Sequence, residues 1–272
     1  MNMFEMSATK RGEQAEMAAW ESVWDAAPAA VRQKLGLSKE RVGNVLVLRA
    51  ANCPVAFFNR ILGLGLDEPA DRSWLEEQLE TYAAAGVPYG VGLCREARPA
   101  EISGWLEAGG LRKKASLAKM MRSTDQLPSE DLRTVIREVG IEEANLFAKT
   151  AAAGFGVPDS LAELFEALPG REGWRFYLSF DAGEAVGTGA LFVRGDVAWI
   201  GFGSTIPSHR HRHLHGAMMA HRMHVAADLG CRWLITETDL PHDGEPAPSF
   251  HNMQRLGFEL AYERANFVAD QT

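Results

Sequence analysis

The segment after Pro207 contains the residue types that most directly suggest chemistry. Arg210 and Arg212 lie in a loop, and the apolar spacing that follows predicts a helix beginning near Leu214. The first turn of a helix has backbone N–H groups without intrahelical partners and a partial positive charge. Two arginines directly before such a turn favour binding of a diphosphate. The formal net charge of the chain is -8, so this local basic site indicates an anionic ligand.

Histidines suggest a second kind of chemistry, metal binding. The eight histidines all lie in the second half of the chain: His209, His211, His213, His215, His221, His224, His242 and His251. Alternating residues share a face only on a strand, and Pro207 argues against a strand here. No CxxC or HExxH pattern lies nearby. We therefore expect no metal and interpret the histidines as polar surface, some of them near phosphate. A histidine-linked metal-binding protein is kept as the alternative.

Cys231 and the pair Gly63 and Gly65 are weaker candidates. Cys231 lies at a predicted helix–strand junction, where a small buried residue is common, so we interpret it as structural rather than nucleophilic. Gly63 and Gly65 follow a predicted strand, but Glu68 occupies the third glycine position of the dinucleotide fingerprint. This excludes a Rossmann-type site.

The composition excludes several classes of protein. With 272 residues, 46% of them hydrophobic and 24% charged, the chain predicts one large or two small globular domains. The acidic net charge disfavours nucleic acid as a partner. The three dispersed cysteines are typical of a reducing compartment. Neither a signal peptide nor a run of about 18 apolar residues is evident, so we expect a cytoplasmic protein that binds no membrane.

A polar segment containing Pro128, from Ser123 to Asp131, predicts a domain boundary. We expect a first domain over residues 1–124 and a second over 130–272. In the second, two helices are predicted, followed by β-rich runs between turn residues, which predict a mixed sheet with helices packed on it. The helices are expected at Ile141–Ala152 and Ser160–Ala167, and the strands at Trp174–Asp181, Ala185–Val193 and Val197–Thr205.

The two halves repeat one order of elements: helix, glycine, apolar strand, loop, helix ending at glycine, and closing strand. Gly86 corresponds to Gly230, and Gly109 to Gly257, at nearly the same spacing. Chance agreement is the alternative, because glycine commonly ends helices. Agreement of several elements in order favours duplication of one α/β fold.

The second half, from about Leu132 to Phe267, resembles the GNAT superfamily of acyl-CoA-dependent N-acyltransferases. The family pattern is a strand, P-x-x-(R/Q)-x-x-G-x-(G/A) opening a helix, another strand, and a helix ending in G-F. The corresponding segments are Pro207–His215 and Ser249–Phe258. The resemblance implies an α/β chain of two tandem GNAT-like domains, each a twisted mixed sheet flanked by helices. The acidic run near Asp67 and Asp71 would repel a pyrophosphate, so we expect a degenerate first copy that forms a wall of the acceptor site.

Four positions depart from the family pattern. His213 and His215 replace glycines that let the backbone approach phosphate, although Gly216 follows directly. Met253 occupies the position of a tyrosine that is proposed to protonate the leaving thiolate in many relatives. Asn252 partly replaces an asparagine that the family has earlier in this helix.

The resemblance also implies roles for individual residues. Acyl-CoA would lie along the strand ending at Thr205, whose N–H groups would polarise the thioester carbonyl, with its pyrophosphate on the loop and helix start. The expected cofactor-binding residues are Gly203, Ser204, Thr205, Arg210, His211, Arg212, His213, Leu214, His215, Gly216 and Asn252. Glu237 is the expected general base, directly or through water; an ion-paired strand carboxylate is the equal alternative. The candidates to protonate the thiolate are Tyr262, Ser249, His251 and solvent.

We therefore predict an N-acyltransferase that moves an acetyl or short acyl group from acyl-CoA to a primary amine of a small molecule. The amine would attack the thioester directly in a ternary complex, with no metal. A non-catalytic acyl-CoA-binding or regulatory module is the alternative. The sequence leaves open the acceptor, which could be an amino acid, another metabolite or a protein amine, and whether the chain forms a homodimer.

Overall fold

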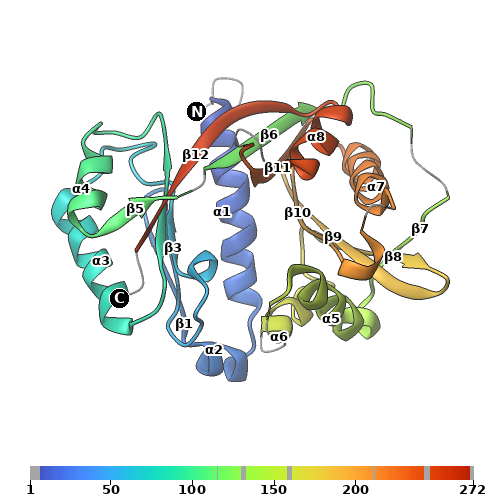
Figure 1. Ribbon diagram of the computed structural model, residues 1–272, viewed down its shortest axis with the longest axis horizontal. Coiled ribbons are helices and arrows are strands. Elements are labelled where there is room, and N and C mark those ends of the chain that lie inside the picture. Colours follow the sequence, from blue (N-terminus) through green and yellow to red (C-terminus); the bar gives the residue numbers. More distant parts are fainter. Residues whose placement is uncertain are drawn as a thin grey trace.

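The computed structural model describes residues 7–114, 116–129, 133–157, 161–210, 212–241 and 246–269. Within these residues, two halves with mixed α/β structure share one 12-stranded sheet, and the long helix α1 (Ala8–Ala26) runs between them (Figure 1). The predicted fold class is therefore confirmed. No helix of the described residues is both long and apolar enough to span a membrane.

The first half consists of short strands and the helices that connect them. Besides α1, its elements are α2 (Ala29–Leu35), β1 (Leu37–Val42), β2 (Val45–Ala50), the 3-10 helix η2 (Ala56–Phe58), β3 (Arg60–Leu62), α3 (Arg72–Ala85), β4 (Gly90–Cys94), α4 (Ile102–Ala108), β5 (Leu111–Lys113) and β6 (Leu117–Ser123). β1 and β2 form a hairpin that turns at Gly43, whose φ of +57° suits glycine. Helix α3 connects the parallel strands β3 and β4.

The second half repeats this plan with longer strands. Its elements are β7 (Val135–Glu138), the 3-10 helix η3 (Ile141–Glu143), α5 (Ala144–Phe155), α6 (Ala162–Glu166), β8 (Trp174–Asp181), β9 (Glu184–Arg194), β10 (Val197–Thr205), the 3-10 helix η5 (Pro207–His209), α7 (Leu214–Asp228), β11 (Trp233–Asp239), α8 (Pro248–Arg255) and β12 (Glu259–Ala269). Helix α7 connects the parallel strands β10 and β11, as α3 connects β3 and β4. A helix that connects two parallel strands is typical of βαβ units.

The last strand of each half lies beside strands of the other half. The order in the sheet is β1-β2-β3-β4-β12-β6-β11-β10-β9-β8-β7. β12 pairs with β4 and β5 of the first half and also with β6, whereas β6 pairs with β11 and β12. The halves are therefore joined through continuous backbone hydrogen bonding. The polar segment that follows β6 connects the halves along the chain, but it does not separate them in the sheet.

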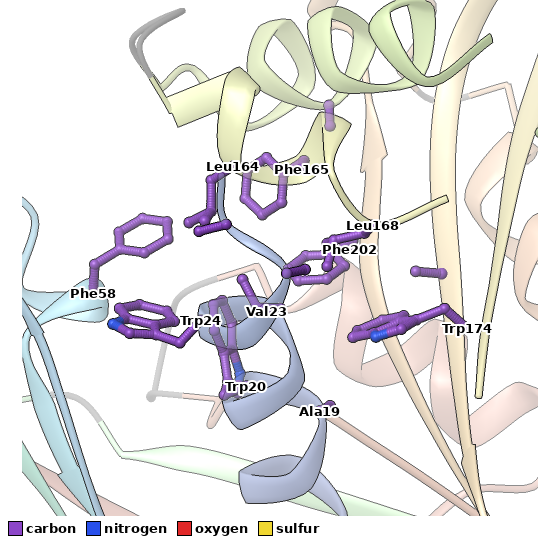
Figure 2. Packing of buried hydrophobic residues seen from close by; sticks show 14 of the residues in the cluster. Ala19, Trp20, Val23, Trp24, Phe58, Leu164, Phe165, Leu168, Trp174 and Phe202 are labelled. Atoms are coloured by element: carbon purple, nitrogen blue, oxygen red, sulfur yellow. The ribbon is translucent and has the colours of Figure 1, made fainter. Parts of the chain in front are cut away.

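Aromatic side chains of α1 pack against both halves and connect their cores (Figure 2). Trp20 and Trp24 of α1 are almost fully buried, and they contact Phe58 of the first half. On the other side, Trp20 packs edge-to-face on Phe202 of β10, with ring centroids 5.5 Å apart. Each such aromatic buries on the order of 150–250 Å² and dominates the local packing energy. A second cluster, rich in methionine, lies under α7 and α8 on the opposite face of the sheet.

Candidate functional site

The strands β10 and β11 separate partway along their length. They are register partners only from Val197 to Trp199, although β10 continues to Thr205. The register of β10 against β9 also shifts between Gly201 and Ser204. Phe202 at this bulge has a φ of +48°, a left-handed conformation that is strained for an aromatic residue. A bulge of this kind redirects backbone groups, and here it does so beside the gap between the strands.

Two cavities meet at this gap. We call the first the aromatic cavity; its volume is about 420 Å³. Its lining residues come from both halves: Trp20, Val55, Phe57, Phe58, Leu117, Phe155, Val157, Phe165, Trp199, Ile200, Gly201, Phe202, Gly203, His215, Met219, Arg222, Thr236, Glu237, Thr238, Asp239 and Met253. The cavity is lined by side chains from both faces of the sheet, because the separated strands β10 and β11 leave a passage between these faces.

The second cavity, which we call the loop cavity, lies at the start of α7 and has a volume of about 1010 Å³. Gly203, His215 and Phe155 line both cavities, so the two adjoin. Most residues predicted to bind cofactor line the loop cavity: Gly203, Ser204, Thr205, Arg210, Arg212, His213, Leu214, His215, Gly216 and Asn252. His211 belongs to the same prediction but lies outside the described residues.

The first turn of α7 faces the loop cavity without a capping side chain. The N-cap residue, His213, has a left-handed φ of 61° and makes no side-chain bond to the helix amides. The amides of this turn are therefore available to an anion. A Cβ at Gly216 would meet nothing within 4 Å, so the approach to the turn is open there. The histidine in place of the first family glycine adopts the backbone conformation that glycine would supply.

The two arginines of the loop already have partners. Arg210 Nη2 donates to the carbonyl of Gly154 at 3.1 Å. Arg212 Nη1 lies 2.6 Å from Asp181 Oδ2, and His209 Nε2 lies 3.5 Å from the same oxygen. Arg212 is more than half exposed, so this pair costs little to rearrange. Asp181 would compete with any anion that Arg212 binds.

The equivalent helix of the first half, α3, begins with a capping carboxylate instead. Asp71 caps α3, and its carboxylate accepts the N–H of Trp74 at 2.8 Å. A negative charge thus already occupies the start of α3, where it would repel phosphate. This contact supports the prediction that the first copy is degenerate.

Arg222 is a buried cation that is not among the residues predicted to form the site. It extends from α7, and its Nη1 donates to the carbonyls of Ala190 at 2.9 Å and Gly201 at 2.8 Å. Space for it exists because Gly189 has no side chain; a Cβ there would lie 2.8 Å from the guanidinium carbon. Burial lowers the pKa of Arg222 to about 9. The available signal was an arginine among the alanines and methionines that form the buried side of α7.

His215 lies beside Arg222, between the two cavities. Burial, with a smaller contribution from the charge of Arg222, lowers the pKa of His215 to about 4. Its ring is therefore neutral near pH 7. No hydrogen-bond partner of its Nδ1 lies among the described residues. The histidine in place of the second family glycine thus adds a neutral polar group at the passage between the cavities.

Glu237 belongs to a buried network of charges that joins α1 to the sheet. Its Oε2 accepts from Lys119 and, at 3.3 Å, from Arg264 Nη2. The same two cations bind carboxylates of α1: Lys119 Nζ lies 2.6 Å from Glu16 Oε2, and Arg264 Nη1 lies 3.1 Å from Glu13 Oε1. Glu237 is thus an ion-paired strand carboxylate that also lines the aromatic cavity. Within the described part of the chain, its Oε1 makes no hydrogen bond or ion pair.

The structure separates the candidates for protonating a leaving thiolate. Ser249 lines the loop cavity. Tyr262 lines neither cavity; its hydroxyl donates to Glu13 at 2.9 Å, and burial raises its pKa well above the usual value. His251 is exposed, lies 3.2 Å from Gln254 Oε1, and lines neither cavity. Met253 lines the aromatic cavity.

Metal-ligating groups and the thiol of Cys231 are the remaining candidates for chemistry. Among the described residues, no group of three or more histidine, cysteine, aspartate or glutamate side chains could hold a metal ion. Cys231 is buried and free, and burial raises the pKa of its thiol to about 11. A thiol with a raised pKa is a poor nucleophile near pH 7.

Solved structures resemble the chain over nearly its full length, although no family model and no curated protein matches its sequence. A GCN5-related N-acetyltransferase from Kribbella flavida has 18% identity and a TM-score of 0.64, covering 95% of this chain and 96% of its own. A tandem GNAT protein from the clavulanic acid biosynthesis pathway has 14% identity and a TM-score of 0.60, covering 98% and 97%. A GCN5-related N-acetyltransferase from Sphaerobacter thermophilus has 16% identity and a TM-score of 0.60, covering 82% and 79%. The chain therefore has the GNAT fold of GCN5-related N-acetyltransferases, in a tandem arrangement of two halves.

Proposed function

We propose that the protein transfers an acetyl or short acyl group from acyl-CoA to a primary amine of a small molecule. The observation that carries the proposal is the junction of the two cavities at the separated strands. An uncapped helix start opens into one cavity, and a carboxylate lines the other. A substrate with a diphosphate at one end and a reactive group at the other needs an anion-binding helix start for the first and a catalytic carboxylate near the second.

In this proposal the pyrophosphate of acyl-CoA binds the amides of the first turn of α7, with Arg210 and Arg212 nearby. Ser204 and Thr205 would contact the pantetheine, and the thioester would lie at the bulge near Gly203. Backbone N–H groups at the bulge would stabilise the oxyanion that forms on the carbonyl oxygen. Arg222 Nη2 would add a donor, since no partner of this nitrogen lies among the described residues and a Cβ at Gly203 would lie 3.3 Å from it.

The chemical step forms one bond and breaks another. The amine nitrogen attacks the thioester carbonyl carbon, the carbon–sulfur bond breaks, and CoA leaves as a thiolate. Glu237 Oε1 would accept the amine proton, directly or through water, while Lys119 and Arg264 hold the carboxylate in place. Ser249 in the loop cavity, or solvent, would return a proton to the thiolate.

Binding and turnover can be measured separately. Acetyl-CoA should raise the melting temperature of the protein, since a ligand of the native state stabilises it, and amines should then cause steady release of free thiol. Zinc alone should have no such effect. The absence of any shift with acetyl-CoA or CoA would contradict the proposal.

A non-catalytic acyl-CoA-binding module is the second candidate. Met253, which cannot donate a proton, favours it, as does the engagement of Arg212 by Asp181. This candidate predicts a melting shift with acetyl-CoA without thiol release on adding any amine.

A further inference from the structure

We infer that the amine acceptor carries an aromatic group, which binds in the aromatic cavity with its amine beside Glu237. This inference rests on the proposed function, because it names the substrate class of the same site. It goes further in that it selects arylalkylamines over hydrophilic amines such as polyamines and amino sugars.

The walls of the aromatic cavity are the first support. Of the described residues, seven that line it have aromatic rings: Trp20, Phe57, Phe58, Phe155, Phe165, Trp199 and Phe202. The rings brace one another, with the centroid of Trp20 5.0 Å from that of Phe57 and 5.5 Å from that of Phe202. Braced rings lose little freedom when a ligand binds, and they offer edges and faces to another ring.

The carboxylates of β11 are the second support. Glu237 and Asp239 occupy alternate positions, so they point to the same face of the strand, and both line the aromatic cavity. Asp239 is exposed and has no ion pair within the described ranges. An incoming ammonium group would meet these carboxylates and the faces of the rings, both of which attract a cation. It could then lose its proton to Glu237 before it attacks.

The same walls disfavour hydrophilic acceptors. A polyamine or an amino sugar carries several charged or hydroxyl groups, which would lie against rings that cannot bond to them. Each polar group buried without a partner lowers affinity. Arg222, a cation that lines this cavity, is already bonded to backbone carbonyls and faces Gly203, where the thioester would lie.

The first half supplies part of this wall. Phe57, which is 40% exposed, belongs to the 3-10 helix η2, and the guanidinium of Arg60 lies 4.0 Å from the centre of its ring. The half that we expect not to hold CoA would thus have kept a role in acceptor selection.

A panel of amines with acetyl-CoA, assayed by thiol release, tests the inference on the unmodified protein. We expect kcat/KM for phenethylamine and tryptamine to exceed that for ethanolamine and spermidine by about tenfold or more, because a buried ring contributes more than a small polar group. Equal or faster reaction of ethanolamine or spermidine would overturn the inference and leave the proposed function standing. No thiol release with any amine, and no melting shift with acetyl-CoA, would instead overturn the proposed function.

A variant at the cavity wall localises the effect. Phe57→Ala should raise KM for phenethylamine about tenfold and change that for ethanolamine little, while the melting shift with acetyl-CoA stays the same. Leu146→Ala is the matched control, because Leu146 is 41% exposed and lines neither cavity. An equal loss of kcat/KM for both amines in Phe57→Ala would contradict the inference.

Discussion

Lys119 and Glu237 are register partners on adjacent strands, one from each half, and their side chains form an ion pair there. The pair directs one carboxylate oxygen into the charge network and leaves the other for the aromatic cavity. Glu237→Gln should therefore lower the rate of acyl transfer about 10²–10⁴-fold, the usual contribution of a general base. The rate of thiol release under saturating acetyl-CoA measures this loss of activity.

The melting shift with acetyl-CoA separates this role from a structural one. We expect Glu237→Gln to keep the shift although it loses turnover. Turnover within a factor of two of the unmodified protein would assign Glu237 to the ion network alone.

Glu16 should contribute strongly to stability. Burial acts to raise its pKa, but the charges of Arg264, Lys119 and Arg60 outweigh burial and hold the pKa well below the usual value. Removing one partner from a buried ion network leaves uncompensated charge, so Glu16→Gln should lower the free energy of unfolding at pH 7 by about 3–5 kcal/mol. Because the folded-state pKa is depressed, this contribution is present above about pH 5 and is lost as pH falls further.

Urea denaturation between pH 3 and pH 8 measures both effects. Glu163→Gln is the control, because Glu163 forms an exposed pair with Lys34 and should change stability by less than about 1 kcal/mol. Similar losses at pH 7 in the two variants would show that the buried network contributes no more than a surface pair.

His215 should add a second pH dependence, at higher pH. Its pKa is lowered from 6.5 to about 4 in the fold, so the unfolded chain binds the proton more tightly. Its contribution to stability, roughly 2–3 kcal/mol, is complete above about pH 6.5 and is lost as pH falls toward 4. His215→Gln should therefore flatten the stability profile between pH 4 and 6.5 relative to the unmodified protein, as measured by urea denaturation. Identical slopes for the variant and the unmodified protein would contradict the assignment.

Gly203 should control passage between the two cavities. A Cβ there would lie 3.3 Å from Arg222 Nη2 and 3.5 Å from His215 Nε2, and Gly203 lines both cavities. Gly203→Val should raise the dissociation constant of acetyl-CoA about tenfold or more, as expected when a binding contact of 1.4 kcal/mol is lost. Gly104→Ala on α4 is the control, because a Cβ there meets nothing within 4 Å. Calorimetric titration with acetyl-CoA measures both; unchanged affinity in Gly203→Val would place the ligand elsewhere.

Asp181 should restrain Arg212 from binding the cofactor. Asp181→Asn removes the negative charge 2.6 Å from Arg212 Nη1, so the arginine becomes free to reach an anion. We expect the affinity for CoA to rise about threefold, within the range of an exposed ion pair, and to become more sensitive to salt. Arg212→Ala should have the opposite effect. Weaker binding by Asp181→Asn would show that the carboxylate supports the loop rather than competing with the ligand.

The local part of this architecture could be predicted from the sequence. The strand, proline turn, arginines and helix start form one continuous segment, so β10 and α7 follow from adjacent residues. The repeat of helix, glycine and strand likewise indicated two copies of one fold. Ten of the eleven residues expected to bind cofactor line one cavity, and His211 lies outside the described residues.

Features that depend on distant pairing could not be predicted. Glu13 and Glu16 give no local sign of their ion pairs, because their cations Lys119 and Arg264 lie more than a hundred residues away. The residue pattern of β12 predicts a strand but not its neighbours, so its position between β4 and β6 could not be read from the local sequence. Predicting the helix Ser160–Ala167 was also inexact: α6 spans Ala162–Glu166, and residues 158–160 lie outside the described ranges.

Because β12 lies between β4 and β6 of the first half, the sheet cannot be completed until the end of the chain has emerged from the ribosome. β6 is synthesised long before β11, and the edge of β4 has no neighbour until β12 appears. Both halves would therefore reach their final form together, near the end of translation. Cutting the gene between them would yield fragments with bare, adhesive sheet edges that tend to aggregate.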